Sequence, residues 1–417
     1  MIPFNRPYVT GREFQYVNAA IEAGHLSGNG DFTRKCDGWL ERTTGCAAAL
    51  LTHSCTGALE MAVMLSEIEP GDEVIMPSYT FVSTANAVVL RGGVPVFVEI
   101  RGDTLNIDET AIEAAVTPRT KAILVVHYAG VGCEMDAIID VAARHDLALI
   151  EDAAQGLGAT YRERPLGSLG HLGAVSFHET KNVISGEGGA LLVNDERHLE
   201  RAQVIHDKGT DRARFWRGEV DKYTWRDIGS SFLMSEINAA FLWAQLESAD
   251  EITAARVRLW EHYHETFAEL ELEGSVRRPT VPPHCRHNAH MYYLLVSAPE
   301  LRDPLLEELE RRGVNSVFHY VPLHSSPAGQ RFGRADSDLG VTDTVSSSII
   351  RLPLWVGMGE QTVERVAANV HDALRELGRD RAAARGRPQP GPVEGELSGP
   401  APATGQAAHT NPVRGGV

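Results

Sequence analysis

Asp152 and Lys181 lie 29 positions apart, and a glycine-rich run at 186–189 follows the lysine closely. A lysine amine can hold an aldehyde as a Schiff base. An acid can keep a pyridine nitrogen protonated, so that the ring withdraws electrons from a bound substrate. These features in this order are typical of a site for pyridoxal phosphate, and they make such a site the first hypothesis.

Lysine is scarce, which limits the candidates for the Schiff base. The five lysines are Lys35, Lys121, Lys181, Lys208 and Lys222. A lysine after a strand is usually a surface residue, and an aspartate there is usually a helix cap, so each signal is weak by itself. Lys181 differs from the other four lysines because it follows a buried-looking apolar run at 174–177. We therefore predict that Lys181 is the Schiff-base lysine.

Apolar runs alternate with helix-like segments through the first half of the chain. Strands are predicted at 73–76, 94–98, 122–127, 147–150, 174–177 and 190–193, and helices at 57–68, 84–90, 109–115, 135–145 and 196–205. Continuous apolar strands in this order favour an α/β fold with a mostly parallel sheet covered on both faces. Ligands of such sheets bind at the carboxyl ends of the strands. Asp152 and Lys181 both follow a strand's carboxyl end.

Other candidate site residues allow two interpretations each. The segment 54–58 opens a helix, so its hydroxyls suit an N-cap, but helix N-terminal amides also bind phosphate. Phe81 follows another strand and is either a core residue or a ring that stacks on the cofactor. The combination along one sheet is more specific than any part of it.

The rest of the chain has a different pattern of predicted helices and strands. A long helix at 251–265, strands at 291–297 and 316–320, a helix at 304–312 and a final amphipathic helix predict a smaller α+β domain. We therefore expect a large cofactor-binding domain at 1–250 and a small domain at 251–377. Residues 378–417 contain few large apolar residues, which predicts a disordered tail.

Composition excludes some classes of protein. A net charge of -17 disfavours nucleic acid and anionic membranes as partners. The sequence has no apolar run of the roughly 18 to 20 residues that a membrane span needs, and no signal peptide is apparent. Five scattered cysteines show no metal-ligand spacing, so we expect no metal site and a cytoplasmic location.

Long segments of the chain resemble the DegT-type family of nucleotide-sugar aminotransferases, which have the fold type I (aspartate aminotransferase-like) architecture of pyridoxal-phosphate enzymes. The resemblance runs from residue 2 to about residue 377. Its most specific segments are 71–87, 106–110, 126–130, 177–182, 221–231 and 317–324. These segments are most similar to the branch that makes dTDP-4-amino-4,6-dideoxygalactose.

The resemblance implies a role for each matching position. Lys181 matches the lysine that binds the cofactor, Asp152 the acid beside the pyridine nitrogen, and Gln155 a residue on the ring-hydroxyl side. Positions matching phosphate contacts are Thr56, Gly57 and Ser176, together with Ser231 from a neighbouring subunit, where the family usually has Asn.

Phe81 matches the aromatic ring that stacks on the cofactor, and His324 matches a residue near the sugar nucleotide. Arg226 is a further candidate, which we expect to bind the diphosphate. The dehydratase branch of the family carries His where this chain keeps Lys181, so transamination is favoured over dehydration.

The resemblance implies a homodimer with shared active sites that transfers an amino group from L-glutamate to C4 of a dTDP-linked 4-keto-6-deoxyhexose. Transamination at C3, or at C4 with the opposite configuration, of another nucleotide-linked keto sugar stays open. A cofactor-binding regulatory protein is disfavoured because no DNA-binding element is apparent. A nucleotide-binding oxidoreductase would need a Gly-x-Gly-x-x-Gly turn after the first strand, which is absent from the sequence there.

Overall fold

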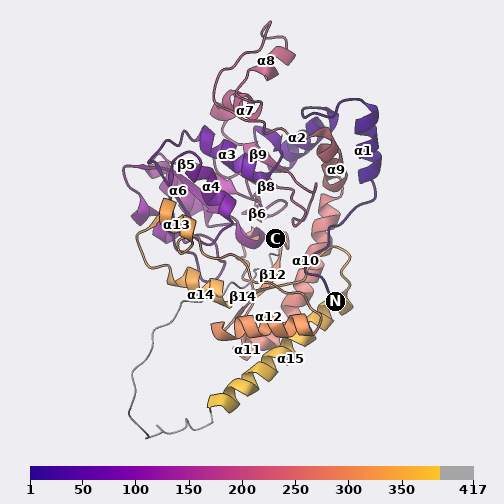
Figure 1. Cartoon of the computed structure of the whole chain (residues 1–417), viewed down its shortest axis with the longest axis vertical. Coiled ribbons are helices and arrows are strands. Elements are labelled where there is room, and N and C mark those ends of the chain that lie inside the picture. Colours follow the sequence, from indigo (N-terminus) through magenta and orange to yellow (C-terminus); the bar gives the residue numbers. More distant parts are fainter. Residues whose placement is uncertain (386–417) are drawn as a thin grey trace, which may run out of the picture. The chain divides into compact units, whose positions relative to one another are not determined.

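A mostly parallel sheet forms the centre of the fold in the computed structural model, which describes residues 1–385 (Figure 1). Its strand order is β1-β9-β8-β5-β4-β2-β3-β13. The strands are β1 (Ala48–Thr52), β2 (Glu73–Pro77), β3 (Val94–Val98), β4 (Thr120–Val126), β5 (Ala148–Asp152), β8 (Leu172–Ser176), β9 (Gly189–Val193) and β13 (Arg334–Ala335). β9 is antiparallel to both of its neighbours, and the other pairs are parallel.

The continuous apolar pattern of the strands has a direct structural cause. Every residue of β2, β8 and β9 is buried, as expected of strands that are covered on both faces. Successive side chains point to opposite faces. Thus Val74 and Met76 belong to one hydrophobic cluster, while Ile75 belongs to another on the opposite face.

Helices cover both faces of this sheet. The helices of this part of the chain are α1 (Glu13–Glu22), α2 (Asp31–Thr44), α3 (Cys55–Leu65), α4 (Val82–Val89), α5 (Glu109–Ile112), α6 (Met135–Arg144), α7 (Leu199–His206), α8 (Arg212–Trp216) and α9 (Glu236–Leu246), with 3-10 turns at Glu113–Ala115, Tyr128–Gly130 and Glu196–His198. The short α8 buries none of its residues and does not take part in covering the sheet. A further 3-10 turn, Pro299–Leu301, lies in the later part of the chain. α3, α4 and α7 contribute to one cluster, and α5 and α6 to the cluster on the opposite face. The predicted two-sided α/β fold is confirmed.

The later part of the chain builds one small sheet by itself and supplies one strand, Cys285–Arg286, to another. One sheet contains β10 (Val276–Arg277), β12 (Tyr292–Val296) and β14 (Ile349–Leu352), and the other contains β11 (Cys285–Arg286), β6 (Thr160–Tyr161) and β7 (Arg164–Pro165). The helices are α10 (Ala249–Thr266), α11 (Ala268–Leu272), α12 (Arg302–Arg311), α13 (Pro327–Phe332), α14 (Gly340–Ser348) and α15 (Glu360–Arg385). Figure 1 shows α11 and α12 close to β12 and β14. A separate hydrophobic cluster unites α10, α12, β12 and β14 with Ile2.

The predicted strand at 316–320 is wrong. This segment pairs only through an isolated bridge between Val317 and Arg351, and beyond it the chain turns toward the large sheet, where the Leu323 amide donates to the Ser78 carbonyl at 3.0 Å.

The expected boundary at 250/251 stays a prediction, although β13 from the later part of the chain joins the large sheet beside β3. The expected end of the fold at 377 falls within α15, which continues to Arg385. The predicted disordered tail lies for its greater part outside the described residues. Among the helices of residues 1–385, none is long and apolar enough to cross a membrane.

Candidate functional site

Asp152 is the last residue of β5 and lies at the centre of the sheet's carboxyl edge. β5 pairs with β4 on one side and β8 on the other. The Asp152 carboxylate is 5% exposed and accepts a hydrogen bond from the Thr84 hydroxyl at 2.8 Å and from the Ala154 amide at 3.1 Å. Burial raises the pKa of Asp152, and both hydrogen bonds and the charge of Lys181 oppose that rise.

Lys181 lies in the loop between β8 and β9, and its amide donates to the His178 carbonyl at 2.9 Å. Burial lowers the pKa of the Lys181 amine, while the nearby Cys55 and Asp152 partly raise it. A lowered pKa leaves a larger fraction of the amine neutral and therefore nucleophilic. The lysine and the acid of the predicted pair therefore lie close enough for their charges to influence each other.

Two helix N-termini meet beside this pair. The Ser54 hydroxyl caps α3 by accepting from the Gly57 amide at 3.1 Å, and the Thr56 hydroxyl lies 2.8 Å from the Ser83 hydroxyl in the first turn of α4. First-turn amides have no acceptor within their own helix, and the helix dipole favours an anion there. The N-cap interpretation of this segment is confirmed. Phosphate binding stays a prediction, which a capped helix start allows.

The glycine-rich run at 186–189 has a packing role. A Cβ atom on Gly189 would lie 2.3 Å from the Cys55 amide nitrogen, and one on Gly188 would lie 2.3 Å from the Ser185 Oγ atom. Only residues without side chains let β9 approach the start of α3 so closely. Ser176, at the end of β8, is also buried, and its hydroxyl lies 3.4 Å from the His178 amide.

Gln155 and two aromatic rings form another side of the site. The Gln155 side chain accepts from the Ala129 amide at 2.7 Å and donates to the Tyr320 hydroxyl at 2.9 Å. The Phe81 ring is 51% exposed and lies 6.2 Å from the Tyr320 ring between centroids. An exposed ring at the N-terminus of α4 favours stacking on a ligand over a role in the core.

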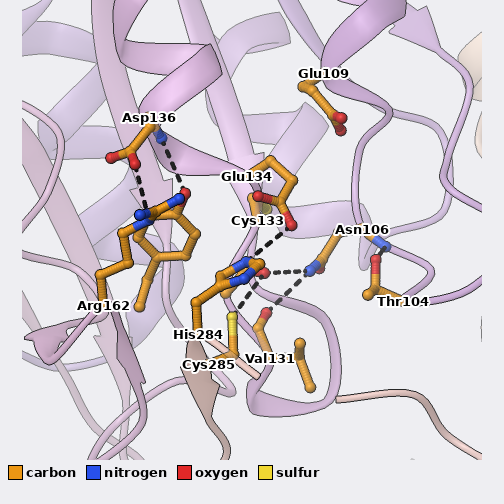
Figure 2. A network of polar contacts seen from close by, with 12 residues as sticks. Thr104, Asn106, Glu109, Val131, Cys133, Glu134, Asp136, Arg162, His284 and Cys285 are labelled. Carbon is orange, nitrogen blue, oxygen red and sulfur yellow. Dashed lines mark hydrogen bonds and ion pairs between the residues drawn. The ribbon is translucent and has the colours of Figure 1, made fainter. Parts of the chain in front are cut away.

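A buried amide holds the loop that carries Tyr128 and Ala129. Asn106 donates to the carbonyls of Val131 and Gly132 at 3.1 and 2.9 Å, and its oxygen accepts from the Tyr128 amide at 2.8 Å. Figure 2 shows Asn106 beside Val131, in a network that also joins His284 to Glu134 at 3.0 Å. Asn106 therefore acts on the site through the loop that orients Gln155.

The remaining predicted residues lie in different places. His324 reaches the carboxyl end of β2, where its Nδ1 atom lies 2.7 Å from the Ser78 hydroxyl. The Arg226 guanidinium pairs with Asp211 at 2.7 Å, and Ser231 is exposed in the same surface segment. Among the described residues, Arg226 contacts Gly209 and Asp211, and Ser231 pairs with Asp207. None of these contacts is with Lys181.

Three site residues escaped the sequence analysis. Thr84 binds Asp152, Ser83 binds Thr56, and Tyr320 binds Gln155. Ser83 and Thr84 follow Phe81 closely and open a predicted helix, so their position at a helix start was a usable signal. Tyr320 gave no such signal, because its segment was expected to be a strand.

Comparisons with known proteins identify the family of the chain. The DegT/DnrJ/EryC1/StrS aminotransferase family profile matches residues 7–371. The chain is 35% identical over 372 residues to the GDP-perosamine synthase of Caulobacter vibrioides, covering 88% of this chain and 97% of that one. It is 33% identical over 383 residues to the spore coat polysaccharide biosynthesis protein SpsC of Bacillus subtilis, covering 90% and 97%. The aminotransferase TlmJ from Streptoalloteichus hindustanus superposes with a TM-score of 0.83 at 28% identity, covering 90% of this chain and all of that structure.

The sheet and its edge define a fold type I enzyme that uses pyridoxal phosphate. The chain belongs to the DegT/DnrJ/EryC1/StrS aminotransferase family and is therefore an aminotransferase. Its residues fit the cofactor of that family. A capped helix start suits the phosphate, a buried carboxylate suits the ring nitrogen, and a lysine amine suits the aldehyde.

Proposed function

We propose that this aminotransferase moves the amino group of L-glutamate to C4 of a dTDP-linked 4-keto-6-deoxyhexose, giving dTDP-4-amino-4,6-dideoxygalactose. The observation that carries the proposal is the buried Asp152, which Thr84 binds at the start of α4 and whose charge influences the Lys181 amine. The choice of sugar rests on the segments at 71–87, 177–182 and 317–324 that resemble the C4 branch.

In this proposal Asp152 and Lys181 divide the chemistry. When bound, pyridoxal phosphate supplies a carbonyl that takes up the amino group and a ring that withdraws electrons. The Asp152 carboxylate, fixed by Thr84, holds a proton on the ring nitrogen. The Lys181 amine removes a proton from the Cα atom of glutamate, and it later returns a proton to C4 of the sugar.

Other residues hold the ligands in place. Thr56, Gly57 and Ser176 bind the phosphate, Phe81 stacks on the ring, and Gln155 contacts the ring-hydroxyl side. Substrate contacts come from His324 and, across the interface of a homodimer, from Arg226, while Ser231 of a second copy of the chain reaches the phosphate. The exposed positions of Arg226 and Ser231 support a role toward a second copy.

A second acceptor is supported by one comparison. The GDP-perosamine synthase of Caulobacter vibrioides is 35% identical to this chain, which favours a GDP-linked keto sugar as the alternative substrate. Transamination at C3, or at C4 with the opposite configuration, belongs to the same alternative.

The deciding experiment incubates the purified holoenzyme with glutamate and a panel of dTDP-, UDP- and GDP-linked 3-keto and 4-keto sugars. Mass spectrometry identifies the aminated product, and proton NMR couplings give the position and configuration of the new amine. We expect the dTDP-linked 4-keto sugar to give the galacto product at the highest kcat/KM. A higher kcat/KM for a GDP-linked or 3-keto sugar would replace the proposed substrate.

The Lys181→Ala variant tests the role of the lysine. We expect it to lose transamination with any acceptor, because the variant lacks the amine that moves the proton. Circular dichroism should show an unchanged fold. Lys121→Ala is the matched control, since Lys121 is exposed in β4, and it should keep wild-type activity. A Lys181→Ala enzyme with wild-type turnover would refute the assignment.

A further inference from the structure

Arg351 is an arginine of the small sheet that contains β10, β12 and β14. It lies in β14, opposite Tyr293 of β12 in the strand register. Its backbone also exchanges two hydrogen bonds with Val317, at 2.7 and 3.2 Å, which fixes the strand next to the segment that carries His319 and Tyr320. The backbone of Arg351 is thus held from both sides.

Arg351 has no counterion among the residues whose side chains are described. Within residues 1–379, whose side chains are described, no carboxylate lies at ion-pair distance from its guanidinium group. Its Nε atom makes one long hydrogen bond to the Phe318 carbonyl at 3.4 Å, and its guanidinium carbon lies 4.8 Å from the centre of the Phe4 ring. Burial lowers the pKa of Arg351, although a guanidinium remains protonated in proteins. A partly buried cation in this state is costly without an anion.

The groups around Arg351 are neutral. The Tyr128 hydroxyl lies 2.7 Å from the Nδ1 atom of His319, and burial lowers the pKa of His319 well below its usual range. Burial raises the pKa of Tyr79, Tyr128 and Tyr320, so all three phenols stay protonated. None of these side chains supplies the missing negative charge at neutral pH.

Arg351 is also close enough to the reacting groups for their charges to interact. Its charge contributes to the lowered pKa of the Lys181 amine, and it acts on Tyr320, whose hydroxyl accepts the hydrogen bond from Gln155. The unpaired cation, the lysine and the ring-side glutamine therefore share one environment.

We propose that Arg351 binds a carboxylate of the amino-acid donor. The proposal rests on the transaminase function and deepens it. The guanidinium fork matches a carboxylate in two parallel hydrogen bonds. The α-carboxylate is one bond from the carbon that must meet Lys181, whereas the diphosphate of a nucleotide sugar is separated from C4 by the sugar ring. A cation whose charge reaches Lys181 therefore suits the donor better than the diphosphate.

The first half-reaction isolates this step. Purified holoenzyme is mixed with glutamate without any sugar, and the change in cofactor absorbance is followed against glutamate concentration. We expect Arg351→Gln to raise the half-saturating glutamate concentration about 10- to 100-fold, the effect of losing a charged hydrogen-bond pair. Arg351→Lys should fall between Arg351→Gln and wild type, because it keeps the charge and loses the fork.

The matched control is Arg277→Gln. Arg277 is exposed on β10 of the same small sheet, so this variant removes an equal charge without touching the site, and the half-saturating concentration should not change. Calorimetric titration of holoenzyme with glutarate gives a readout that needs no turnover, and its affinity should fall in parallel for Arg351→Gln. If Arg351→Gln does not fold, the glutamate and glutarate affinities of Arg351→Lys test the proposal, and both should be weaker than those of the wild type.

The outcomes separate the two proposals. Unchanged glutamate and glutarate affinities in the Arg351 variants would overturn the role of Arg351. A raised KM for the nucleotide sugar alone would also overturn it and assign the arginine to the diphosphate. If wild-type enzyme reacts with glutamate but aminates no nucleotide-linked keto sugar, the proposed acceptor fails while the role of Arg351 stands.

Discussion

At the scale of single residues, the Thr84 hydroxyl favours the ionised form of Asp152. It donates to the Asp152 carboxylate at 2.8 Å and opposes the rise in pKa that burial causes. Thr84→Val removes this bond and keeps the side-chain shape. We expect kcat to fall about 10- to 100-fold, as for other hydrogen bonds to charged groups. Because the pKa of Asp152 should rise, the acidic limb of the pH–kcat/KM profile should move to higher pH.

The control for Thr84→Val is Thr110→Val. The Thr110 hydroxyl also donates to an aspartate, Asp108, at 2.7 Å, but this pair is exposed at the start of α5. Its loss should leave kcat and the pH profile unchanged. A Thr84→Val enzyme with a reduced kcat and an unshifted acidic limb would mean that Thr84 does not act through the Asp152 proton.

Site residues could be predicted from the sequence where the residue type is rare in the chain or where the residue follows a predicted strand. Lys181 and Asp152 emerged because lysines are few and both residues follow strands. Thr84 and Arg351 did not emerge, because their importance depends on contacts between elements far apart in the sequence. Arg226 illustrates the same limit, since its pairing with Asp211 shows only in the fold.

At the scale of elements, Glu73 joins β2 to β13 and to the loop that precedes β4. It opens β2, accepts from Arg334 of β13 and from Thr117 at 2.9 and 2.7 Å, and also binds Arg119. Burial by itself raises the pKa of Glu73, but these hydrogen bonds outweigh it and lower the pKa to about 2. The side chain is 1% exposed.

The lowered pKa gives a testable pH dependence of stability. Unfolded chain protonates Glu73 near pH 4.5, before the folded chain does. The stabilisation is therefore complete above that pH and is lost as the pH falls toward 2. Glu73→Gln should reduce the free energy of unfolding by up to about 3 kcal/mol at pH 7, and by less at pH 3. Urea titrations at both pH values measure the difference.

A surface carboxylate provides the comparison for Glu73. Glu113 pairs with Arg144 at 2.9 Å but is 53% exposed, and exposed ion pairs contribute little. Glu113→Gln should change the free energy of unfolding much less than Glu73→Gln does at pH 7, and by a similar small amount at both pH values. An equal effect of Glu73→Gln at pH 7 and pH 3 would show that ionisation of Glu73 does not stabilise the sheet edge.

Elements with a strong local pattern were predicted well, and those defined by distant pairing were not. The strand 94–98 has the predicted bounds because its apolar run is short and flanked by turns. The predicted strand at 316–320 failed because strand-like residues form a strand only when a partner lies alongside, and here the pairing is limited to Val317. The two-residue β13 is too short to leave any periodicity.

At the scale of the whole molecule, the segment 212–231 leaves large apolar side chains in contact with solvent. Trp216 and Trp225 are 70% and 79% exposed, and Tyr223 is 50% exposed. Exposed apolar groups that cluster in this way mark interaction surfaces. Ser231, proposed to reach the phosphate of a second copy, ends the same segment. Formation of a dimer would therefore bury these rings and complete the site together.

Trp225→Glu tests that coupling, because it places a charge where the proposed dimer would bury an indole. We expect light scattering after size exclusion to show a shift from dimer to monomer, and specific activity to fall with it and recover partly at high protein concentration. Leu272→Glu is the control, since Leu272 is 89% exposed on α11 and should leave both mass and activity unchanged. Because a shared site needs both copies, a Trp225→Glu monomer with full activity at every concentration would show that one chain holds a complete site.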